Sequence, residues 1–209
     1  MSKELVIVFV KNIKLGKVKT RLAKTIGDQG AFEVYSNLVK VTEMATKDLS
    51  VDKRIYFSDA TVDTIWKNDY KTIQHGVDLG ERMKNAFKKG FEDGYERIVL
   101  IGSDLPDITA NHINKGLEAL KQNEVSFGPA EDGGYYLIGL SKMHNFVFDN
   151  KPWSKTHLLE ETLSELKENG VTFTTLVTLN DIDTYDDLVA SKFYQSNTAL
   201  QEKIKQLHD

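Results

Sequence analysis

The sequence of 209 residues contains no cysteine and only three prolines. Without cysteine it can have no disulfide bond, no thiolate nucleophile, and no zinc or iron–sulfur site built on thiolates. Its longest apolar run, residues 5–10, is far too short to span a bilayer. It also has no Asn-x-Ser/Thr sequon and no secretory signal pattern. Together these absences favour a cytoplasmic protein with no membrane partner.

Several well-known catalytic motifs are absent as well. The sequence has no GxxxxGK[ST] P-loop, no GxGxxG after its first strand, no HExxH metal motif and no nucleophile elbow. Walker-type ATPases, dinucleotide-dependent dehydrogenases and Ser/His/Asp hydrolases are therefore not supported. The formal net charge of −4 argues against a broad nucleic-acid-binding face, which is usually basic.

Short apolar segments alternate with amphipathic ones along the whole chain. Strands are expected at 5–10, 54–58, 72–74, 97–103, 125–128, 135–140 and 173–179. Helices are expected at 28–47, 79–91, 109–120, 156–168 and 199–207, with one or two helical turns within 61–66. This alternation predicts an α/β protein with three α/β/α layers, a mostly parallel central sheet and a single domain over residues 1–209. In such sheets ligands bind beyond the carboxyl ends of the strands.

The first strand runs into a stretch rich in positive charge. Residues 11–24 contain six basic residues and no acidic one, namely Lys11, Lys14, Lys17, Lys19, Arg21 and Lys24. Backbone N–H groups at a helix N-terminus, together with basic side chains, commonly bind phosphate. Gly16 would allow a tight turn, and Lys19 and Arg21 could reach a polyphosphate. We therefore expect Lys11, Gly16, Lys19 and Arg21 to bind a nucleotide, the alternative being a solvated surface loop.

Two aspartates near predicted strand ends are candidate metal ligands. Asp104 follows the strand at 97–103, and Asp183 lies in the acidic segment 180–187. Mg²⁺ or Mn²⁺ needs few protein carboxylates when phosphate and water oxygens complete its coordination. Asp104 could instead cap a helix or form a turn. For Asp186 and Asp187 the structural interpretation is preferred, because acidic residues stabilise the first turn of a helix.

Two further segments supply polar or glycine-rich groups after predicted strands. In the segment 74–83, Gln74, Asp78 and the N–H of Gly80 are candidate hydrogen-bonding groups for a base or ribose. Arg82 is a further candidate nucleotide-binding residue, although it could simply pair with a carboxylate. The segment 128–136 has paired glycines that would let a ligand approach the backbone, or that would form an ordinary turn. The candidate acceptor-binding residues are Asp132, Gly133, Gly134, Tyr135 and Trp153.

Five ordered motifs between residues 5 and 190 resemble a known family. They are KxxxxGxVKTRLA at 11–23, DLGERM at 78–83, GSDLP at 102–106, GPAEDGGYYLIGL at 128–140 and DIDTYDDL at 181–188. This set resembles a bacterial group of glycosyltransferase-A-like proteins related to 2-phospho-lactate guanylyltransferase. The resemblance implies the Rossmann-like nucleotide-diphospho-sugar transferase fold, a divalent metal and a nucleotide substrate.

The sequence departs from the better-known members of this fold. It lacks the glycine-rich loop of sugar-nucleotide pyrophosphorylases, having only Gly16 before its KTRL, and it lacks the Asp-x-Asp of many glycosyltransferases. The basic loop favours nucleotidylyl transfer from a nucleoside triphosphate to a small phosphorylated acceptor, with Lys19, Arg21 and Asp104 as catalytic residues. Glycosyl transfer from a nucleotide-diphospho-sugar is the alternative, and a non-catalytic nucleotide-binding module is a remote third.

Overall fold

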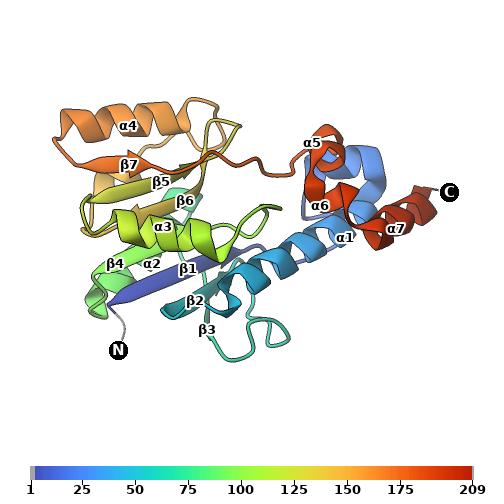
Figure 1. Cartoon of the computed structure of the whole chain (residues 1–209), viewed down its shortest axis with the longest axis horizontal. Coiled ribbons are helices and arrows are strands. Elements are labelled where there is room, and N and C mark those ends of the chain that lie inside the picture. The colour runs from blue at the N-terminus through green and yellow to red at the C-terminus, as the bar shows by residue number, and fades with distance from the viewer. Residues whose placement is uncertain (1–2, 209) are drawn as a thin grey trace.

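The computed structural model describes residues 3–208 and has a seven-stranded sheet at its centre (Figure 1). The strands are β1 (Glu4–Val10), β2 (Asp52–Phe57), β3 (Tyr70–Ile73), β4 (Arg97–Ile101), β5 (Val125–Pro129), β6 (Tyr135–Leu140) and β7 (Phe173–Thr175). Their spatial order is β3-β2-β1-β4-β6-β5-β7. Strand β6 runs antiparallel to β4 and β5, whereas the other neighbouring pairs are parallel.

Helices cover both faces of the sheet, which confirms the three-layer α/β/α fold. Side chains alternate along β1, so Val6, Val8 and Val10 pack in the core under α1 (Thr20–Lys47) and α3 (Ala110–Ala119). Leu5, Ile7 and Phe9 face the opposite core under α2 (Leu79–Glu92) and α4 (Leu158–Glu168). Strand β1 is therefore buried on both sides, which explains its continuous apolar run.

A third, smaller core joins the start of α1 to the last part of the chain. Helix α1 is kinked at Gly27, whose φ of 71° is not helical. Leu22 and Ile26, before the kink, pack against the apolar residues Ile182, Leu188, Leu200 and Ile204. The latter belong to or flank the helices α5 (Tyr185–Ala190), α6 (Lys192–Gln195) and α7 (Thr198–His208) (Figure 1). The sequence predicted the helix only from residue 28, because Gly27 interrupts its periodicity.

Two other expectations differ from the structure. Residues 61–66 form no helix but irregular chain with a turn and a bend, and Trp66 is bound to α1: its N–H donates to Glu43 (2.7 Å) and its indole N–H to Thr46 (2.9 Å). The last strand is shorter than expected: β7 ends at Thr175, near the register shift in β5 between Gly128 and Pro129. A 3₁₀ turn, η1 (Asn145–Val147), follows β6. None of the helices in residues 3–208 has the length and apolarity that a membrane span requires.

Candidate functional site

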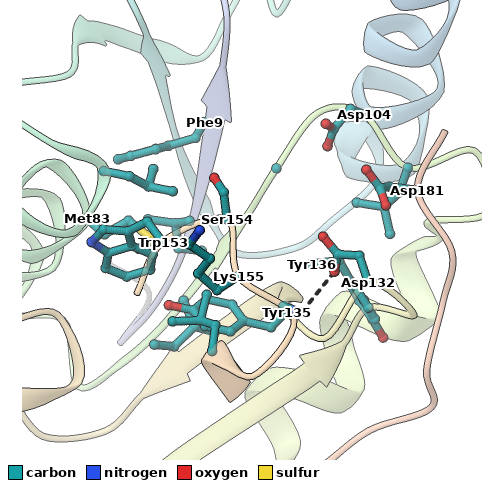
Figure 2. Close-up of a pocket in the computed structure, with 18 residues that line it drawn as sticks. Phe9, Met83, Asp104, Asp132, Tyr135, Tyr136, Trp153, Ser154, Lys155 and Asp181 are labelled. Atoms are coloured by element: carbon teal, nitrogen blue, oxygen red, sulfur yellow. Dashed lines mark hydrogen bonds between the residues drawn. The ribbon is translucent and has the colours of Figure 1, made fainter. Parts of the chain in front are cut away.

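Two adjoining pockets lie beyond the carboxyl ends of β1 and β4. The polar pocket, of about 440 Å³, is lined among others by Lys11, Lys19, Gln74, Arg82, Asp104 and Asp183. The apolar pocket, of about 260 Å³, is lined among others by Phe9, Met83, Asp104, Tyr135, Trp153 and Asp181 (Figure 2). Asp104 lines both pockets, so it stands at their junction.

Lys19 is the most enclosed cation of the site. It occupies the N-cap of α1 with a left-handed φ of 44°, and its side chain is 7% exposed. Its Nζ lies 3.0 Å from Asp104 Oδ2 and 3.7 Å from Asp181 Oδ2. Burial by itself lowers the pKa of Lys19, but the charges of Asp104 and Asp181 outweigh burial and raise the pKa above its usual value. Lys19 therefore stays protonated at the end of the sheet.

Arg21 pairs with the second predicted metal ligand. Its NH1 lies 2.5 Å from Asp183 Oδ2, and its side chain is 67% exposed. Asp183 lines the polar pocket, whereas Arg21 lies on the outer side of this pair. The structure thus brings Lys19, Asp104 and Asp183 together at one end of the sheet, whereas Arg21, which pairs with Asp183, lines neither pocket.

The other basic residues of segment 11–24 divide into two groups. Lys11 lines the polar pocket. Lys14 pairs with Asp59 at 3.1 Å, and Lys17 and Lys24 are exposed. Gly16 has a φ of 71°, and a Cβ there would lie 3.2 Å from Asp28 Oδ2, so this glycine permits the turn toward α1. Most of the positive charge of the segment is therefore not directed into the pocket.

Two hydrogen-bonding residues that sequence reasoning missed fix the loop after β1. The hydroxyl of Tyr35, on α1, accepts from Lys11 N (3.0 Å) and lies 2.9 Å from Ser103 Oγ, next to Asp104. Asn12 Oδ1 accepts from the N–H of Asp59 at 2.8 Å. Burial raises the pKa of Tyr35. In the sequence Tyr35 matches the apolar face of a helix, and nothing there indicates its hydroxyl contacts.

The residues predicted from segment 74–83 have different positions. Gln74 and Arg82 line the polar pocket; the Gln74 amide donates to Tyr56 O (2.9 Å), and Arg82 Nε donates to Gly76 O (3.1 Å). Gly80 is buried in α2, where a Cβ would lie 2.4 Å from Phe148 O and 2.7 Å from Trp153 Cζ2. Close packing of α2 against the segment around Trp153 therefore accounts for this glycine.

Three carboxylates gather along one side of the apolar pocket. Figure 2 shows Asp104, Asp181 and Asp132 on this side. Burial raises the pKa of Asp181 to about 6, with Lys19 opposing the shift and Asp104, Asp132 and Asp183 adding to it. Sequence reasoning chose Asp183 from this acidic segment and missed Asp181, although the two residues are only two positions apart.

The chemistry of these acidic groups is compatible with a hard divalent cation. The side chains of Asp104 and Asp183 are 39% and 35% exposed and line the polar pocket, and one oxygen of each is paired with Lys19 or Arg21. Within residues 3–208, however, no set of three acidic or histidine side chains is arranged as a metal site. Phosphate or water oxygens would have to complete the coordination, as Mg²⁺ commonly requires.

The predicted acceptor residues also separate by position. Asp132, Gly134, Tyr135 and Trp153 line the apolar pocket. A Cβ on Gly133 would lie 1.8 Å from the carbonyl oxygen of Thr156, and φ at Gly133 is 87°. This glycine therefore lets the segment 153–158 pack against the strand β6 side of the pocket. That segment also brings Ser154 and Lys155 into the lining, which the sequence did not indicate.

Comparison with solved structures identifies the fold. A protein from Desulfovibrio desulfuricans G20, provisionally assigned as a nucleotide-diphospho-sugar transferase, is 32% identical over 99% of both chains, with a TM-score of 0.83. The inositol-1-phosphate CTP transferase from T. maritima is 16% identical, with 98% of this chain and 96% of that chain covered and a TM-score of 0.53.

A third structure, CMP:2-keto-3-deoxy-manno-octonic acid synthetase complexed with CTP, is 12% identical, with 97% and 99% of the two chains covered and a TM-score of 0.53. A search of curated protein sequences found no match. The specific relationship to 2-phospho-lactate guanylyltransferase stays a prediction. The family described as an uncharacterized protein conserved in bacteria (DUF2064) matches residues 42–155, and the chain belongs to this family.

Proposed function

We propose that the protein is a transferase that binds a nucleotide in the polar pocket and an acceptor in the apolar pocket. The observation that carries this proposal is the position of Asp104, which lines both pockets and lies 3.0 Å from the buried ammonium of Lys19. A group passing from one pocket to the other would have to pass this carboxylate. The nucleotide-binding and transferase activities of proteins with the same fold support the assignment.

The leading reaction is nucleotidylyl transfer. An oxygen of a phosphorylated acceptor attacks the α-phosphorus of a nucleoside triphosphate, the bond to the bridging oxygen breaks, and pyrophosphate leaves. Lys19, Lys11 and Arg82 bind the phosphates and stabilise their charge. Asp104 and Asp183 would hold a divalent ion, which supplies further charge stabilisation at the phosphate oxygens.

Glycosyl transfer is the second candidate, and one observation favours it. Lys14, Lys17 and Lys24 do not contribute to the polar pocket, so the pocket carries less positive charge than the basic segment suggests. A leaving nucleoside diphosphate has less charge to neutralise than a triphosphate undergoing substitution. The similarity to the D. desulfuricans protein agrees with this alternative.

Titration calorimetry with Mg²⁺ distinguishes the two reactions. Nucleoside triphosphates and nucleotide-diphospho-sugars are titrated into the wild type, Lys19→Ala and the matched control Lys17→Ala, whose lysine is exposed in the same loop. Loss of a charged hydrogen bond by Lys19→Ala should weaken triphosphate binding about tenfold to a hundredfold. Lys17→Ala should change it less than about threefold.

Equal losses for both ligand classes in Lys19→Ala would count against nucleotidylyl transfer. If no nucleotide of either class binds the wild type, the proposed function is wrong. Binding without release of pyrophosphate or nucleoside diphosphate, over a broad panel of acceptors, would instead indicate a binding module.

A further inference from the structure

The apolar pocket has two chemically different sides. The carboxylates of Asp104, Asp132 and Asp181 lie on one side, and Phe9, Met83 and Trp153 lie on the other (Figure 2). A compact, fully polar molecule would leave the second side without suitable contacts. A pocket of about 260 Å³ has room for a ring-sized apolar group.

One residue that lines this pocket, Tyr135, carries a buried hydroxyl group with no partner. Within residues 3–208, the Tyr135 hydroxyl is the buried side-chain polar atom without a hydrogen bond. The neighbouring Tyr136 also lines the pocket, but its hydroxyl donates to Val177 O at 3.1 Å. An unpaired buried hydroxyl destabilises a fold, and binding of a ligand would explain why it is present.

The segment that closes the pocket beside Tyr135 has an unusual backbone. Asn150 and Ser154 have φ values of 55° and 64°, in the left-handed region that side chains rarely adopt. Trp153, which lies between these two residues, and Lys155, which follows Ser154, both line the pocket. Strained backbone of this kind is concentrated at sites that bind ligands.

We propose that the apolar pocket selects an acceptor that has an apolar, ring-sized body and a hydrogen-bonding oxygen or nitrogen that pairs with the Tyr135 hydroxyl. The inference rests on the proposed function, because it specifies the acceptor of that reaction. The reacting end of the acceptor faces Asp104, and its apolar body contacts Trp153, Met83 and Phe9. Tyr135 is a specificity-determining residue of this pocket.

Two probes of nearly equal shape test the proposal: 4-fluorophenol, which has a hydroxyl group, and 4-fluorotoluene, which has a methyl group instead. Their affinities are measured by ¹⁹F NMR for the wild type, Tyr135→Phe and Tyr136→Phe. The wild type should bind 4-fluorophenol about threefold to tenfold more tightly, as one hydrogen bond provides. Tyr135→Phe should lose this preference, and Tyr136→Phe should keep it.

Indole N–H signals show where the probes bind. Both probes should shift the signal of Trp153, which lines the pocket, and leave that of Trp66 unchanged, because Trp66 is buried in the core on the other face of the sheet. Glucose, a fully polar ring, should shift neither signal. A preference that survives Tyr135→Phe, or a Trp153 shift with glucose as large as with 4-fluorophenol, would overturn the proposal.

Thermal denaturation gives a second test. Tyr136→Phe should lower the Tm, because it removes a hydrogen bond, whereas Tyr135→Phe should leave the Tm unchanged or raise it. A lower Tm for Tyr135→Phe would show that the hydroxyl is already satisfied and would overturn its proposed role. If nucleotides bind the wild type but neither probe shifts Trp153, this inference fails while the proposed function stands. Probe binding without nucleotide binding would show that the pocket holds such a group but that the proposed transfer reaction, and with it the role of the pocket as an acceptor site, is wrong.

Discussion

The two pockets share Asp104 but are built by different forces. At the polar pocket, ion pairs join residues far apart in sequence: its lining residue Lys19 pairs with Asp104 and Asp181, and its lining residue Asp183 pairs with Arg21. The wall of the apolar pocket depends on close packing of the segment 153–158 against Gly133. The first pocket is therefore held by charge and the second by shape.

This difference predicts how each pocket responds to ligand. A phosphate that binds Lys19 must compete with Asp104 and Asp181, which already neutralise its ammonium group. A ligand in the apolar pocket gains contact with side chains that packing has already placed. A charged substrate should therefore rearrange the ion pairs of the polar pocket, whereas affinity for the apolar pocket should depend mainly on how well the shape of the ligand matches it.

The largest effect is expected at the shared residue. Asp104→Asn should reduce turnover about a hundredfold to a thousandfold, because it removes a charge at the junction where transfer occurs. The fold should persist, because this side chain is 39% exposed. Release of pyrophosphate or nucleoside diphosphate measures the effect, with the exposed Asp107→Asn as the control. Near-normal turnover in Asp104→Asn would remove the basis for coupling the two pockets.

The packed pocket should fail when its backbone contact is blocked. Gly133→Ala places a Cβ 1.8 Å from Thr156 O at a φ of 87°, so we expect it to lower the free energy of unfolding by about 3 kcal/mol. Gly170→Ala is the control, because φ there is 66° and no atom lies within 4 Å of the added Cβ; about 1 kcal/mol is expected. Urea denaturation measures both values.

Nucleotide binding to folded Gly133→Ala should survive, whereas 4-fluorophenol binding should be lost. Loss of both would mean that the two pockets are not independently supported.

A smaller effect, which depends on pH, is expected at Asp181, because this residue lines the apolar pocket and also pairs with Lys19. The pKa of Asp181 in the folded protein is about 6, above its ordinary value of 3.8. The folded state therefore binds this proton more tightly than the unfolded state, and the wild type loses stability as the pH rises from about 4 to 6. Asp181→Asn removes that loss, so it should stabilise the protein by about 2 kcal/mol more at pH 7.5 than at pH 4.

Urea denaturation at the two pH values measures this difference, and Asp186→Asn, an exposed substitution in the same segment, is the control. A stability difference between Asp181→Asn and the wild type that does not change with pH would contradict the assigned cause.

Much of the fold follows from local sequence patterns. The double-sided burial of β1 is visible in its apolar run, and Asp186 and Asp187 lie in the first turn of α5, as their structural interpretation predicted. The rule that ligands bind at the carboxyl ends of strands also predicted that Lys19 and Asp104 lie together. These features depend on short-range periodicity or on the topology of parallel sheets.

Other parts of the site depend on contacts that a sequence does not contain. Both ligand approach and backbone packing require a glycine, so the sequence could not show that Gly80 and Gly133 face protein atoms. Asp181 and Asp183 differ by two positions in one acidic segment, and only the position of Lys19 distinguishes them. The hydroxyl of Tyr35 anchors a loop from within what the sequence shows only as an apolar helix face.

The kink at Gly27 has a consequence for evolution and engineering of this protein. Before the kink, Leu22 and Ile26 pack in the third core with Ile182 and Leu188; after it, α1 contributes both to this core and to the core against the sheet. Lys19 and Asp181 therefore both lie next to residues of this small core. They belong to the same two chain segments as Arg21 and Asp183, which are 162 positions apart. Substitutions that improve packing in this small core would therefore restrict the motion of both the Lys19 ammonium group and the Asp181 carboxylate, without replacing either residue.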